Sequence, residues 1–128
     1  MAIQDLKYHK ITEKIIGCAM KVHRHFGMGF PGIVYKRALM IELEKIGLKF
    51  KQEIEKNIVY DDKLIYKRRL DLIIEEVVLV ELKALKEIDN ADYNQILNYL
   101  KVFKLEVGIL LNFGAPTLQF KRLINSIK

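Results

Sequence analysis

The stretch from Arg69 to Lys83 places charged residues within an otherwise apolar run, and this pattern constrains the fold of the whole chain. It reads R-L-D-L-I-I-E-E-V-V-L-V-E-L-K and predicts two short strands, with Asp71 near the start of the first and Glu81-Leu82-Lys83 at the end of the second. Alternation along a strand puts Glu81 and Lys83 on one face and Leu82 on the other. A carboxylate and an ammonium are costly on so apolar a strand unless they have a use.

The length of the loop between the two strands decides whether the acidic side chains meet. Directly opposed residues of an antiparallel pair share a face. A three-residue loop from Glu75 to Val77 would set Asp71 opposite Glu81, whereas a two-residue turn would oppose Asp71 to Val80. No Asn-Gly or Asp-Gly pair in this stretch demands the two-residue turn, so both geometries stay open.

Two carboxylates that converge on one point make a site for a hard divalent cation. Mg²⁺, or Mn²⁺ in its place, prefers such oxygen ligands. Lys83 beside the ion could stabilise developing negative charge or orient a water molecule. In the helix predicted to follow, Gln95 and Tyr99 are four residues apart and therefore share a face. They either reach the cation site or a phosphate, or they are an exposed helix residue and a partly buried aromatic.

The remainder of the chain contains further helical and strand-like segments. Helices are predicted from about Asp5 to His25 and from about Val34 to Ile46, and the Gly-rich breaker cluster between them predicts a helical hairpin. Gly17 inside the first helix suggests the close packing of another element. Strands are predicted at Phe50–Tyr60, Leu64–Ile74, Val77–Lys83 and Val107–Leu111, with a helix from Asp89 or Asn90 to Phe103 and either a strand or a helix at Leu118–Ile124. This order predicts an α/β domain around a mixed β-sheet.

Length, charge and cysteine content limit the classes of protein to which the chain can belong. Its 128 residues predict a single domain over 1–128, and no run approaches the roughly 18 apolar residues of a membrane span. The first residues lack the basic-then-apolar order of a secretion signal, and the single cysteine, Cys18, fits a reducing cytoplasm. The net charge of +6 favours a polyanionic partner such as nucleic acid.

Several segments together resemble a known family. The runs R-R-L-D-L-I-I, L-V-E-L-K-A, Q-I-L-N-Y-L and V-G-I-L-L-N-F-G, preceded by I-I-G-C-A-M-K-V-H-R-H-F-G-M-G, look like the small GxxExxY proteins of the PD-(D/E)XK nuclease superfamily. The resemblance covers nearly the whole chain and implies a restriction-endonuclease-like core. It implies that Asp71 and Glu81 are acidic metal ligands, with the backbone carbonyl of Leu82 as a further ligand. It implies that Lys83 is the catalytic lysine and that Gln95 and Tyr99 form a Q-x-x-x-Y element. It also implies contacts to backbone phosphates from Lys67, Arg68 and Arg69.

The chain departs from the family pattern at two places. Gly32 stands where the motif that names the family has its glutamate, and Asp92 stands where related sequences often have a histidine. The resemblance itself implies a Mg²⁺-dependent nuclease acting on DNA, or on RNA, in repair, recombination or defence. The alternative is a catalytically impaired nuclease-fold protein that binds nucleic acid or a protein partner. A homodimer that pairs through an edge strand at Phe50–Tyr60 is also expected.

Overall fold

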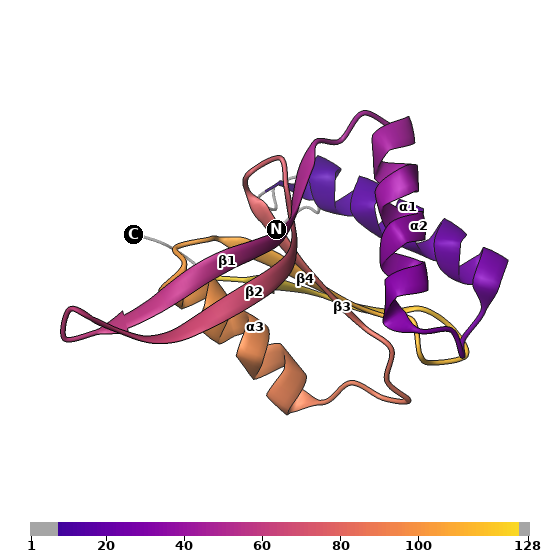
Figure 1. Ribbon diagram of the computed structural model, residues 1–128. Helices are drawn as coiled ribbons and strands as arrows, with labels where there is room; N and C mark the ends of the chain where they lie inside the picture. The colour runs from indigo at the N-terminus through magenta and orange to yellow at the C-terminus, as the bar shows by residue number, and fades with distance from the viewer. Residues whose placement is uncertain (1–7, 126–128) are drawn as a thin grey trace.

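The computed structural model describes residues 8–125, which form three helices and five strands (Figure 1). The strands form one sheet in the order β1-β2-β3-β4-β5. Strands β3 and β4 are parallel and every other neighbouring pair is antiparallel, so the predicted mixed sheet is confirmed. The elements are α1 (His9–Phe26), α2 (Gly32–Lys45), β1 (Phe50–Tyr60), β2 (Lys63–Ile74), β3 (Val78–Lys83), α3 (Asn90–Val102), β4 (Val107–Asn112) and β5 (Gln119–Ile124).

The helices cover the two faces of the sheet. The hairpin of α1 and α2 packs on one face, where its apolar residues form a core with alternate residues of β2, β3 and β4. Helix α3 packs on the other face through Ile96 and Leu100. The predicted helical hairpin and the predicted flanking of the sheet by helices are therefore confirmed, and the layered α/β architecture follows from the apolar alternation of the central strands.

Most predicted boundaries agree with the structure to within two residues. Helix α2 begins at Gly32 instead of Val34, with Pro31 as its N-cap residue. The segment Leu118–Ile124, for which the sequence allowed either a strand or a helix, contains the strand β5. The predicted start of the first helix at Asp5 lies outside the described residues.

The environment of Gly17 differs from the prediction. This glycine is exposed on α1, and a Cβ built there meets no atom within 4 Å, so the expected close packing of another element is wrong. Cys18, the next residue, is buried, and burial raises the pKa of its thiol. No helix of the described part of the chain is both long and apolar enough to cross a membrane.

The hairpin of β1 and β2 bends where Asp71 lies. Leu70 and Leu72 have the same parity along β2, yet Leu70 packs with the α3-side core and Leu72 with the core under α1 and α2. The register between the strands is unchanged across this point, where Glu53 of β1 lies opposite Asp71 and has a positive φ of 51°. Both strands therefore turn their faces at Glu53 and Asp71, which explains why a polar residue can stand between two buried leucines.

Candidate active site

The register of β2 and β3 sets the two predicted acidic residues opposite each other. Leu72 pairs with Val80 and Ile74 with Val78, so residues 75–77 form the three-residue loop and the count continues to Asp71 opposite Glu81. Glu75 and Glu76 have positive φ angles of 52° and 61°, which close this loop without glycine. The loop geometry that joins the two acids on one face is thus confirmed, and the two-residue turn is excluded.

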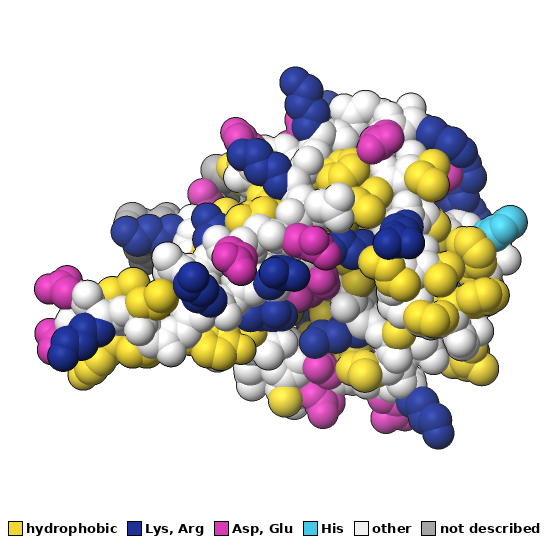
Figure 2. Space-filling model, in the orientation of Figure 1, with side chains coloured by type: hydrophobic (Ala, Val, Ile, Leu, Met, Phe, Trp, Pro, Cys, Tyr) yellow, Lys and Arg dark blue, Asp and Glu magenta, His cyan; other side chains and the backbone are white. Residues whose placement is uncertain are grey.

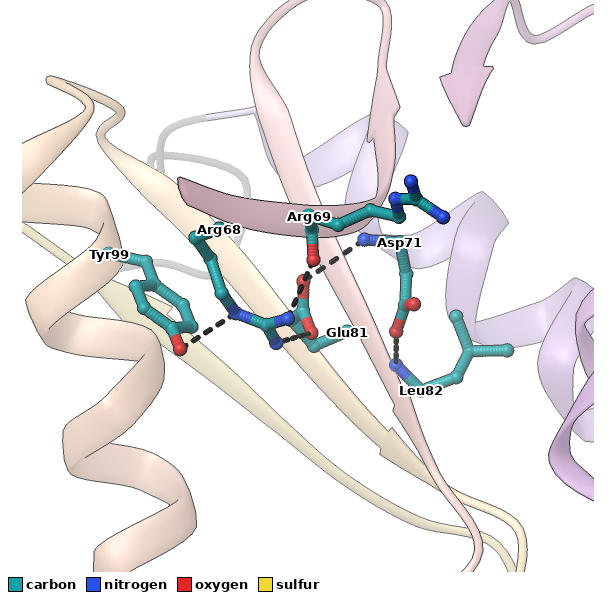
Figure 3. A network of polar contacts seen from close by, with 6 residues as sticks. All are labelled: Arg68, Arg69, Asp71, Glu81, Leu82 and Tyr99. Atoms are coloured by element: carbon teal, nitrogen blue, oxygen red, sulfur yellow. Dashed lines mark hydrogen bonds and ion pairs between the residues drawn. The ribbon is translucent and has the colours of Figure 1, made fainter. Parts of the chain in front are cut away.

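The strands separate beyond Leu72 and Val80, and the acidic side chains fill the fork. The backbone N–H of Asp71 donates to Glu81 Oε1 at 3.1 Å, and the backbone N–H of Leu82 donates to Asp71 Oδ2 at 2.9 Å (Figure 3). Each carboxylate therefore accepts a hydrogen bond from the other strand in place of the missing ladder bonds. This reciprocal arrangement holds both acids at one end of the β2–β3 pairing.

Arg68 connects the acidic pair to helix α3. Its guanidinium donates to Glu81 Oε2 at 3.2 Å, to the Tyr99 hydroxyl at 2.7 Å and to the carbonyl oxygen of Arg69 at 2.7 Å. The guanidinium carbon also lies 4.9 Å from the centroid of the Tyr99 ring. Figure 3 shows Arg68 between the helix and the fork, with its side chain directed at Glu81.

Glu81 is the most strongly perturbed acid of the site. It is only 2% exposed, and burial, followed by the like charge of Asp71, raises its pKa from 4.5 to about 7. The Asp71 N–H and the charges of Arg68 and Lys83 act in the opposite direction. A buried carboxylate in this state gains from any cation that approaches it, because a positive charge compensates the lost hydration.

The donor set fits a divalent cation that keeps part of its hydration shell. Mg²⁺ is usually held by one or two carboxylates together with water and substrate oxygens. Asp71 and Glu81 supply the carboxylates, and the backbone carbonyl of Leu82 lies between Glu81 and Lys83 in sequence. Residues 8–125 contain no group of three or more His, Cys, Asp or Glu side chains that could enclose an ion. The chemistry of the site therefore suits a cation shared with substrate better than one enclosed by protein.

The remaining predicted residues lie at different distances from the fork. Lys83 is the last residue of β3, and its charge acts on the pKa of Glu81. Tyr99 joins the site through Arg68, whereas Gln95, one turn earlier on α3, is partly buried and its side chain makes no hydrogen bond within residues 8–125. Lys67 and Arg69 are exposed on the β1–β2 hairpin, and Arg69 lies 3.7 Å from Glu55.

Asn112 was missed by the sequence analysis, which ended the predicted strand at Leu111. It is fully buried at the end of β4, opposite Lys83 in the parallel register. Its amide bonds both backbone groups of Leu85, at 2.8 Å and 2.9 Å, and the side chain of Gln119 at 2.8 Å. These contacts hold the chain that leaves Lys83, and the only sequence signal for them is a polar residue directly after an apolar strand.

Tyr35 and Lys36 of α2 connect the segment around Gly32 to the site. Tyr35 is fully buried, donates to the carbonyl oxygen of Gly27 at 2.6 Å and stacks on Phe113, so it anchors the loop before α2. Lys36 is also buried, and its ammonium lies 3.8 Å from Glu53, the residue opposite Asp71. Gly32 lies one turn before Lys36 and shares its helix face, which turns toward the bend beside Asp71.

Comparisons with known proteins give one family and one fold. The family model of the PD-(D/E)XK nuclease superfamily matches residues 9–123. No curated protein matches the chain. A solved structure described as "Crystal structure of SSO0001" is similar with a TM-score of 0.57 and 21% identity over 76% of this chain. The match covers 51% of that protein, so the chain spans about half the length of this neighbour, and the likeness shows the fold alone.

Proposed function

Since the chain belongs to the PD-(D/E)XK nuclease superfamily, we propose that it hydrolyses phosphodiester bonds of DNA with the aid of Mg²⁺ at Asp71 and Glu81. One observation carries this proposal: the three-residue loop sets the two acids opposite each other at the fork of β2 and β3. The backbone carbonyl of Leu82 would be a further ligand. A bound divalent ion lowers the pKa of a water molecule and neutralises charge on a phosphate.

Lys83 and Tyr99 have distinct roles in this proposal. The ammonium of Lys83, next to Glu81, stabilises negative charge that develops on the scissile phosphate or orients the attacking water. Tyr99 positions the guanidinium of Arg68 through the 2.7 Å hydrogen bond. Gln95, one helical turn away on the same face, contacts a phosphate or a water of the site when substrate is present.

Basic residues on β2 hold the nucleic-acid backbone in this proposal. Lys67 and Arg69 are exposed, and Arg68 lies between them with its guanidinium at Glu81. If a divalent ion were held by Glu81, the guanidinium of Arg68 would be free to contact a phosphate of the substrate. Such contacts carry no sequence preference, so we expect cleavage that is independent of base sequence.

A cleavage assay with matched variants tests the proposed reaction. Wild-type protein should cut DNA in Mg²⁺ or Mn²⁺ and not in EDTA, and Asp71→Ala and Lys83→Ala should each lower the rate by at least about a hundredfold. Lys14→Ala, at an exposed position of α1 outside the fork and the basic residues of β2, should retain most of the activity. Failure of the wild type to cut single- or double-stranded DNA or RNA would contradict the proposal. Cleavage that survives both substitutions would locate the activity elsewhere.

The catalytically impaired nuclease fold is the second candidate, and Gly32 is the observation in its favour. The motif that names the GxxExxY family has glutamate at this position. Gly32 shares a face of α2 with Lys36, whose ammonium reaches Glu53 opposite Asp71. A Cβ at Gly32 meets no atom within 4 Å, so Gly32→Glu fits without rearrangement. If the missing glutamate limits activity, Gly32→Glu should raise the cleavage rate, and Gly32→Gln should not. Equal rates for all three proteins would show that position 32 plays no part.

Several finer expectations from the sequence stay predictions. They are membership of the GxxExxY family, a preference for DNA over RNA, a role in repair, recombination or defence, a single domain over 1–128 and a cytoplasmic location. A homodimer through β1 also stays a prediction. Strand β1 is an edge of the sheet, but its charged residues and the bulge at Ile58 and Val59 are features that discourage strand pairing between copies.

A further inference from the structure

The β1–β2 hairpin extends beyond the rest of the sheet. Strand β3 pairs with β2 only at residues 72–74, so most of the hairpin has no third strand beside it. Figure 1 shows it projecting from the body of the molecule. Large apolar side chains are nevertheless exposed along it, among them Val59, Tyr60, Leu64, Ile65 and Tyr66. Exposed apolar groups concentrated on one projecting element indicate an interaction surface.

The register divides these side chains between the two faces of the hairpin. Ile54 and Leu70 pack with the α3-side core, and the residues that follow outward on the same face are the cross-strand pairs Lys56–Arg68 and Ile58–Tyr66. The contact of Arg68 with Tyr99 of α3 confirms the assignment of this face. We call it the α3-side face of the hairpin. Val59, which follows Ile58 on the regular strand β1, lies on the opposite face with its partner Leu64, and the unpaired Ile65 is the extra residue of the bulge.

The composition of the α3-side face fits nucleic acid better than a second copy of the chain. The centres of protein interfaces are depleted in lysine, whereas here Lys56 lies between the apolar pair Ile58–Tyr66 and the core residue Leu70. The face combines Lys56 and Arg68 with Tyr66, which is 58% exposed, and it has no acidic residue along these pairs. Cations alternating with an exposed aromatic ring are the arrangement on which unpaired bases stack while phosphates are neutralised.

We propose that the α3-side face of the hairpin is a track for an unpaired nucleic-acid strand, with Tyr66 as a base-stacking platform and Lys56 as a phosphate contact. The track rests on the proposed function, since it leads to the acidic fork. Arg68, two residues from Tyr66 on the same face, already contacts Glu81. Tyr66 lies five residues before Asp71 along β2, and a rise of about 3.3 Å per residue places the platform about 17 Å from the acids.

The tip of the hairpin limits the track. Asp61 and Asp62 form the turn, and their charges repel phosphates. Figure 2 shows hydrophobic and basic side chains next to each other along the projecting hairpin, with acidic side chains at its end. The nucleic-acid strand therefore binds between the apolar pair Ile58–Tyr66 and the fork. The substrate class that this surface selects is a single strand or the frayed end of a duplex, because bases inside a duplex are already stacked.

Oligonucleotide binding in EDTA, where no cleavage occurs, tests the track. Fluorescence anisotropy with a labelled 20-mer of thymidine should show that Tyr66→Ala weakens binding about tenfold and that Tyr66→Phe does not. Val59→Ala is the matched control on the opposite face and should bind as the wild type does. Lys56→Ala should reduce the slope of log K against log salt by about 0.7, whereas Tyr66→Ala should leave the slope unchanged. A 20-base-pair duplex should be less sensitive to Tyr66→Ala.

Three results would overturn the track. They are equal affinity of Tyr66→Ala and wild type for the single strand, an equal loss for single strand and duplex, and a wild-type dimer in sedimentation that Tyr66→Ala converts to a monomer without changing oligonucleotide affinity. The last result would assign the face to self-association. If wild-type protein cuts no substrate but single-strand binding depends on Tyr66, hydrolysis is contradicted and the track remains.

Discussion

Glu81 links the stability of the fold to the state of the site. Its carboxylate is buried, and burial together with the Asp71 charge raises its pKa to about 7 in the folded protein, compared with 4.5 in the unfolded chain. Between these values the folded state binds more protons than the unfolded state. The contribution of Glu81 to stability is therefore complete below about pH 4.5 and is lost as the pH rises through about 7.

The pH dependence of unfolding tests this arrangement. In EDTA, the free energy of unfolding of the wild type should decrease from pH 5 to pH 8, relative to Glu81→Gln, by about 2–3 kcal/mol. Glutamine keeps the size of the side chain and does not titrate, so the difference between the two proteins isolates Glu81. Urea unfolding at four pH values measures it. A difference that stays constant across this range would contradict a raised pKa.

Arg68 is expected to compete with a divalent cation for Glu81. Its guanidinium bonds Glu81 Oε2 at 3.2 Å, so a cation bound by the same carboxylate would lie close to a like charge. Replacing Arg68 with alanine should therefore strengthen Mn²⁺ binding about tenfold at pH 8.5, where Glu81 is ionised. Titration calorimetry measures the affinity, and Arg69→Ala is the matched control. Weaker Mn²⁺ binding by Arg68→Ala would show that the guanidinium supports the cation site.

At the level of elements, the end of β4 holds the chain that leaves the site. The Phe113 N–H donates to the carbonyl oxygen of Lys83 at 2.9 Å, and Asn112 bonds the backbone of Leu85. Gly114 approaches the same backbone so closely that a Cβ there would lie 2.4 Å from both N and O of Leu85. Three consecutive residues, the last of β4 and the two that follow it, therefore hold the backbone at and after Lys83.

A pair of glycine substitutions tests the role of this contact. Gly114→Ala should lower the free energy of unfolding by about 1–3 kcal/mol and reduce cleavage, because the added methyl group displaces residues 84–85 and with them Lys83. Gly17→Ala on the exposed side of α1 should be neutral or stabilising by up to about 1 kcal/mol, since nothing lies within 4 Å. Chemical unfolding and the cleavage assay together measure both effects. Unchanged stability and activity in Gly114→Ala would contradict the role of this contact.

The elements themselves were largely predictable, because apolar alternation and breaker residues are local signals. The pairing of Asp71 with Glu81 was predictable as one of two loop lengths, and the structure selects the three-residue loop. The bend at Glu53 and Asp71 was not predictable, since Leu70 and Leu72 have the same parity and the sequence does not show that they pack on opposite faces. The burial of Asn112 likewise depends on contacts with residues distant in sequence.

For the molecule as a whole, the PD-(D/E)XK nuclease superfamily and the layered fold could be identified from the joint order of motifs. The partners of Arg68 could not. The sequence analysis gave this residue a phosphate contact, whereas the structure pairs it with Glu81 and Tyr99, which lie 13 and 31 residues away. Sequence spacing does not show which residues of a helix will contact a strand from a different part of the chain. The exposed side chains of the hairpin likewise became apparent only from the short pairing with β3.

The central claim is that Asp71 and Glu81 hold one divalent cation together. The most direct measurement is the anomalous difference density of a crystal grown or soaked at pH 8 in Mn²⁺, with an Asp71→Ala crystal as the control. We predict a single peak at the fork, within about 2.6 Å of a carboxylate oxygen of each acid, with the guanidinium of Arg68 moved away from Glu81. The peak should be absent from the control. A saturating Mn²⁺ soak that leaves Arg68 bonded to Glu81 and places no peak between the two acids would contradict the claim.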